Sequence, residues 1–162
     1  MSAVAWALGT FHTSVVGIAL LLLVYPGGGL GVTLGGLNTL TGLALFVALW
    51  TTTVFTTGRA IRGLRLIGDD RAETGAFYRR ALRWGAANGV LFLISLVVIL
   101  VVNALLTAAP SVQIGAILAL AAFEGIIGAF VAFAIGALVG LVLAGLDLVA
   151  LRIARAVVGP TA

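Results

Sequence analysis

The sequence predicts an all-α membrane protein, a polytopic bundle of transmembrane helices that forms a single domain of 162 residues. Two features of the composition predict this fold class. Hydrophobic residues make up 62% of the chain and charged residues 9%, whereas an ordinary soluble domain is about 25% charged. Seven of the nine Arg residues lie between positions 58 and 85, so few charges interrupt the apolar tracts elsewhere. Such a chain cannot cover its surface with polar groups, and we expect lipid to surround most of it.

Residues 4–25 are predicted to form the first span, because about 20 apolar residues cross the hydrocarbon core of a bilayer. Gly9, Thr13 and Gly17 recur at every fourth position in this tract. Small residues at this spacing let the backbone of another helix approach closely, so these three are expected to form a packing face. Pro26 and the glycines that follow it are expected to end the helix.

Residues 36–57 are predicted to form the second span and residues 86–106 the third. In the second span, Thr41, Thr52 and Thr56 fall on one stripe at helical spacing. Polar side chains in lipid seek partners on other helices, so this stripe is expected to face the inside of the bundle. For the same reason we expect Asn88, in the third span, to hydrogen-bond to another helix.

The Arg-rich segment, residues 58–85, is expected to join these two spans as a helical hairpin in the cytoplasm, because positively charged loops stay on that side. Asp70 and Glu73 have the spacing of a capping box, which predicts a helix from Arg71 directly into the third span. The arginines orient the chain in the membrane. Six of them are also expected to contact anionic lipid headgroups at the inner face: Arg59, Arg62, Arg65, Arg79, Arg80 and Arg83.

The last apolar tract, residues 112–157, is long enough for one long helix or for two spans. Small residues recur at every fourth position along it, and we call them the small-residue ladder: Gly128, Ala132, Gly136, Gly140 and Ala144. An unbroken ladder indicates one continuous packing surface, whereas a tight turn in mid-tract would need more turn residues. One long, kinked helix also keeps all the arginines on the cytoplasmic side. We therefore predict four spans and a cytoplasmic N-terminus, with five spans as the alternative.

Glu124 and His12 are candidates for an intramembrane ion or proton site, because both are expected near mid-membrane. An acid within a span costs about 2.5–3.5 kcal/mol on insertion scales, so Glu124 is expected to face a partner or a cavity. His12 could be that partner; the alternative is that Glu124 only ties helices together. Asp147 is expected to pair with an arginine of the hairpin. One His and one Glu are too few ligands for a zinc site, and no metal or cofactor is expected.

The sequence contains no nucleotide-binding, catalytic-triad or metalloprotease motif, so we expect neither an enzyme nor a nucleic-acid-binding protein. The function expected first is that of a structural or accessory subunit of the cell membrane. It would assemble through small-residue helix faces, as a homo-oligomer or in a larger membrane complex. The alternative is a small oligomeric transporter or channel-like protein that uses Glu124 as a proton or cation site.

Overall fold

A computed structural model describes residues 3–24, 39–62, 71–107 and 114–158 of the chain. Four α-helices make up these residues: α1 (Ala3–Val24), α3 (Thr39–Ala60), α4 (Arg71–Thr107) and α5 (Ile114–Val158). Each contains a segment long and apolar enough to cross a membrane, by length and composition. The predictions of an all-α fold and of four long apolar helices are therefore confirmed. The tip of the expected hairpin, residues 63–70, lies outside the described residues.

The helices fall into two length classes. Helices α1 and α3 have 22 residues each, whereas α4 has 37 and α5 has 45. At about 1.5 Å per residue, the short helices extend about 33 Å and the long ones about 55 and 68 Å. Helix α4 begins at Arg71 and continues without a break into the apolar tract that follows. Helix α5 is likewise one helix from Ile114 to Val158, so no turn divides the last tract.

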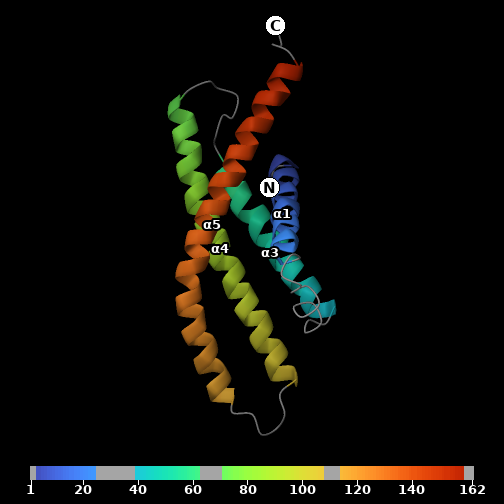
Figure 1. Cartoon of the computed structure of the whole chain (residues 1–162), viewed down its shortest axis with the longest axis vertical. Helices are drawn as coiled ribbons and strands as arrows, with labels where there is room; N and C mark the ends of the chain where they lie inside the picture. The colour runs from blue at the N-terminus through green and yellow to red at the C-terminus, as the bar shows by residue number, and fades with distance from the viewer. Residues whose placement is uncertain (1–2, 25–38, 63–70, 108–113, 159–162) are drawn as a thin grey trace.

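The long helices α4 and α5 cross each other in an antiparallel pair (Figure 1). Glycines form the contact, with Gly85 of α4 facing Gly136 and Gly140 of α5. A Cβ on Gly85 would lie 2.5 Å from the carbonyl oxygen of Gly136, and a Cβ on Gly140 would lie 2.5 Å from that of Ala81. Any side chain at these positions would therefore collide with backbone. This close approach is what small residues permit between helices.

All five residues of the small-residue ladder face α4. Gly128 lies against Leu93, and Ala132 against Gly89. At the other end, Ala144 is buried in a cluster with Phe77 and Ala81, and Ile61, Tyr78 and Leu148 pack around this cluster. The ladder is thus a packing surface, as its spacing indicates, and it is covered by another helix of the same chain.

Helix α3 packs on α4, and α1 packs on α3. Gly9 of α1 lies so close to α3 that a Cβ there would stand 2.6 Å from the Cα of Val54. Thr13 is buried and donates its hydroxyl to the Gly9 carbonyl at 2.8 Å. Nothing lies within 4 Å of a Cβ at Gly17. Gly9 and Thr13 of the expected packing face are therefore packed within the chain, whereas the third residue, Gly17, has none of the described helices against it.

The outward faces of the helices are strongly apolar. Phe130 is 77% exposed and Leu106 is 82% exposed, and many other large hydrophobic side chains are more than half exposed. The buried side chains are mostly small residues and threonines instead. In water, an apolar surface this extensive would drive association.

A cavity between the four helices

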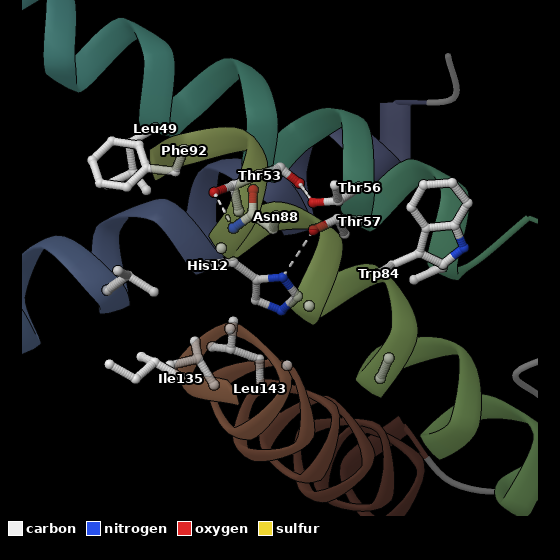
Figure 2. Close-up of a pocket in the computed structure, with 18 of the residues that line it drawn as sticks. His12, Leu49, Thr53, Thr56, Thr57, Trp84, Asn88, Phe92, Ile135 and Leu143 are labelled. Atoms are coloured by element: carbon white, nitrogen blue, oxygen red, sulfur yellow. Dashed lines mark hydrogen bonds between the residues drawn. The ribbon is translucent and has the colours of Figure 1, made fainter. Parts of the chain in front are cut away.

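Side chains from all four helices line a central cavity of about 530 Å³. Its walls are mainly apolar and include Leu49 of α3, Phe92 of α4, and Ile135 and Leu143 of α5 (Figure 2). Glycines of the crossing between α4 and α5 also line it, and they fill little of the space. Polar groups occur at six positions in the lining: His12, Thr53, Thr56, Thr57, Asn88 and Asp147.

His12 joins three helices through its imidazole ring. The side chain projects from α1, and the residue is 5% exposed. Its Nε2 atom lies 3.0 Å from Oδ1 of Asp147 on α5, and its Nδ1 atom lies 3.2 Å from the hydroxyl of Thr57 on α3. Figure 2 shows the ring between Thr57 and the side chains of α5. Both ring nitrogens are therefore occupied, and both partners come from other helices.

This geometry accommodates His12 in two protonation states. When the imidazole is neutral, Nε2–H donates to the Asp147 carboxylate and Nδ1 accepts from the Thr57 hydroxyl. When the ring is protonated, both nitrogens donate, and the Thr57 oxygen becomes an acceptor. A hydroxyl can fulfil either role by rotating its hydrogen. Either form of the ring can therefore keep both hydrogen bonds.

Asn88 of α4 provides a second polar contact in the cavity. Its amide nitrogen donates to the hydroxyl of Thr53 on α3 at 3.3 Å, which confirms the predicted hydrogen bond to another helix. Its carbonyl oxygen is buried and has no partner among the described residues. Buried acceptors are usually paired, so this atom is available to a donor from a molecule inside the cavity.

Nearby threonines are satisfied within their own helix. The Thr56 hydroxyl donates to the carbonyl of Thr52 at 2.8 Å, and Thr52 donates to Leu49 at 3.1 Å. Thr41 and Thr56 are both buried, as their stripe predicts. The threonines that bond other helices, Thr53 and Thr57, lie beside that stripe and were missed by the sequence pattern.

Asp147 is the acid that bonds His12 in the structure, and the expected pairing of His12 with Glu124 stays a prediction, because the side chain of Glu124 lies outside the described residues. Asp147 therefore faces the bundle, and the ion pair found for it within the described part of the chain is with His12. One signal could have indicated this: Asp147 follows Ala144 by three residues, so it lies on the same helical face as the ladder.

Four of the six arginines expected at lipid headgroups surround one groove. Arg59 in the last turn of α3, Arg62 just after that helix, and Arg80 and Arg83 of α4 line a groove of about 490 Å³ with Trp84 and Ala87. We call this the arginine groove. Arg79 is exposed but does not line it. Arg65 lies outside the described residues.

Within the described residues, no group of three His, Cys, Asp or Glu side chains could hold a metal ion. The cavity and the arginine groove are two places where described residues gather polar groups around a space. No curated protein and no solved structure matches the chain. The chain belongs to a family of unknown function, DUF7965, which it matches over residues 1–162.

Proposed function

We propose that this protein is a multi-pass membrane protein that binds a small, largely apolar molecule in its central cavity and carries it across or along the membrane. The observation that carries this proposal is the cavity itself, which all four helices bound and which has a His–Asp pair inside it. The exposed apolar faces of the helices support the proposal that the protein lies in a lipid bilayer, since exposing these faces to water would be unfavourable in free energy.

The size and lining of the cavity suit a small ligand. Ligand sites usually measure about 300–1,000 Å³ and have apolar walls with a few polar groups that orient the ligand. Here the walls supply the apolar contact, and the free carbonyl oxygen of Asn88 can accept a hydrogen bond. We therefore expect the ligand to be mainly hydrocarbon or aromatic, with at least one hydrogen-bond donor.

The His12–Asp147 pair gives the carrier a group that responds to protons. An ion pair attracts more strongly in a low-dielectric interior than in water. Protonated His12 would therefore hold α1 to α5 by charge as well as by a hydrogen bond, and neutral His12 by the hydrogen bond alone. Ionisable groups inside membrane proteins commonly belong to substrate or proton pathways. In this proposal, proton exchange at the pair changes how firmly the cavity is closed.

The first test identifies what the cavity holds. Val139 lines the cavity, whereas Val142 on the same helix is 63% exposed and does not line it. Wild-type protein, Val139→Trp and Val142→Trp would be purified from membranes in mild detergent, and the small molecules they release would be identified by mass spectrometry. We expect a molecule that wild type and Val142→Trp retain and Val139→Trp loses. Identical profiles from all three proteins would exclude a ligand in the cavity.

The second test asks whether binding leads to transport. Proteoliposomes would be loaded with the identified molecule in labelled form, and its release would be followed with wild type, Asp147→Asn and Glu124→Gln. We expect Asp147→Asn to slow release at least severalfold while the molecule still binds. If release is lost in Glu124→Gln but not in Asp147→Asn, the proton site would be assigned to Glu124 instead. If release from the proteoliposomes is no faster than from loaded liposomes without protein, the protein binds the molecule but does not transport it.

The structure gives less support to an accessory subunit. That function was expected because the small-residue ladder offered a docking surface, but α4 of the same chain covers the ladder. An accessory subunit would have to assemble through other surfaces.

A further inference from the structure

The arginine groove lies at the junction between the end of α3 and the first half of α4. We propose that it is a binding site for a phosphomonoester group, carried either by an anionic lipid or by a free phosphate. The site is separate from the cavity. Trp84 lines both spaces, while the other groove residues belong to the groove alone.

Four like charges lie around this one space. An arginine side chain is always protonated in a protein, and no acidic residue among those described lines the groove. Charges of the same sign at short range repel each other, and an anion between them removes that repulsion. A phosphomonoester carries close to two negative charges at neutral pH, more than a phosphodiester does. The charge of the groove therefore favours the monoester.

Two of the arginines are held in place before any ligand arrives. A guanidinium nitrogen of Arg80 donates to the backbone carbonyl of Arg62 at 2.7 Å, near the end of α3. The guanidinium carbon of Arg59 lies 4.9 Å from the centre of the Phe55 ring and 5.9 Å from that of Trp84. Such cation–π contacts fix the position of the charge. Preorganised guanidinium groups bind phosphate with little loss of side-chain freedom, because their planar forks match its oxygens.

Arg62 and Arg83 are exposed, and their side chains make no hydrogen bond or ion pair within the described part of the chain. They are the groups left to bind a phosphate directly. The groove also adjoins the apolar segments of α3 and α4. A lipid phosphate could therefore enter it with its hydrocarbon chains lying along the exposed helix faces.

The experiment compares two neighbouring arginines of equal charge. Arg83 lines the groove and Arg79 does not, although both are exposed on α4. Detergent-purified wild type, Arg83→Gln and Arg79→Gln would be titrated with short-chain phosphatidic acid, and bound lipid would be counted by native mass spectrometry. Phosphatidylglycerol with the same chains is the control, because its headgroup is an anionic phosphodiester. In a parallel titration, inorganic phosphate would compete with the phosphatidic acid.

We expect wild type and Arg79→Gln to bind phosphatidic acid in preference to phosphatidylglycerol, and Arg83→Gln to bind phosphatidic acid about tenfold more weakly, since charge-assisted hydrogen bonds are lost. Competition by millimolar inorganic phosphate would support the site and assign it to free phosphate, whereas no competition would support it and assign it to lipid. If Arg83→Gln and Arg79→Gln bind phosphatidic acid equally weakly, the lipid is held by general electrostatic attraction to the basic surface, and the proposal is overturned. No preference for phosphatidic acid over phosphatidylglycerol in wild type would also overturn it. Neither result depends on whether the cavity binds a ligand.

Discussion

At the residue scale, His12 and its two partners link helices that are far apart in the sequence. Thr57 and Asp147 lie 45 and 135 residues away from it. The three side chains are mostly buried, so each depends on the others for hydrogen bonds that water would otherwise provide. When one partner is removed, a buried polar group is left unpaired, which costs about 1–3 kcal/mol.

Replacement of Asp147 should therefore destabilise the bundle to an extent that depends on the new residue. In Asp147→Asn, the amide oxygen can still accept from Nε2 of His12, so we expect only a small fall in thermal stability. In Asp147→Ala, Nε2 loses its partner, and the free energy of unfolding should fall by about 1–3 kcal/mol. Unfolding followed by circular dichroism in detergent would measure both. Equal stability of the alanine variant and wild type would show that the contact does not hold α1 to α5.

The sequence pattern led to His12 but not to its acid. His12 stood out because it is the only histidine in an apolar chain, whereas both Glu124 and Asp147 were available to pair with it. The choice between them depends on how α1 lies against α5. That placement follows from the packing of α1 on α3 and of α3 on α4, which no local spacing encodes. Thr57 was missed for the same reason, since its hydroxyl could equally have bonded within its own helix.

At the element scale, the crossing of α4 and α5 depends on residues that have no side chain. Gly140 and Gly145 lie on the same helix and differ in their surroundings. A Cβ at Gly140 would stand 2.5 Å from the carbonyl oxygen of Ala81 and 2.9 Å from the Cα of Gly85, whereas a Cβ at Gly145 would meet nothing within 4 Å. Because the atoms near Gly140 are backbone, they cannot move aside without parting the helices.

The substitution Gly140→Ala should accordingly lower the free energy of unfolding by about 1–3 kcal/mol, the usual cost of overpacking. Gly145→Ala provides the matched control. It should leave stability unchanged or raise it by up to about 1 kcal/mol, because Ala favours helix more than Gly does. Both values would come from denaturation in the same detergent. A similar effect of the two substitutions would contradict the close crossing.

The number and length of the helices could be predicted because long apolar runs and an unbroken ladder are local features. Residues 4–25 were expected to form a helix, and α1 spans Ala3–Val24. The partner of the ladder could not be predicted. A row of small residues indicates close approach but does not name the helix that approaches. The matching row, Ala81, Gly85 and Gly89, is partly within the Arg-rich segment, where the charges drew attention to the membrane surface.

At the scale of the whole molecule, the chain has two short helices and two that are much longer. Helices of about 33 Å match the hydrocarbon core of a bilayer, which is about 30 Å thick. Helices of about 55 and 68 Å exceed it, so their ends would project into the headgroups or beyond. The arginine groove lies where α3 ends and α4 continues, which would place it near one boundary of the membrane, and the positive-inside rule predicts that this is the inner one.

This arrangement predicts which sites a membrane-impermeant thiol reagent can reach. The chain has no Cys, so each cysteine variant has a single thiol. Gly75→Cys, at an exposed position near the start of α4, should react only after the cells are permeabilised. Ser111→Cys lies between the third predicted span (86–106) and the last tract (112–157), on the side opposite the Arg-rich segment in the four-span prediction, and should react in intact cells. Labelling by a fluorescent maleimide would show both, and the opposite pattern would mean that the protein has the reverse orientation.

Helix α1 packs on α3, whereas α1 and α5 are not among the extensively packed helix pairs, and the His12–Asp147 hydrogen bond is one contact between them. The seam between these two helices is therefore a lightly packed part of the cavity wall. In a bilayer this seam would border fatty acyl chains and not the aqueous phase. A hydrophobic guest could then enter sideways from the lipid through such a portal, and its uptake would depend on its concentration in the membrane more than on its solubility in water.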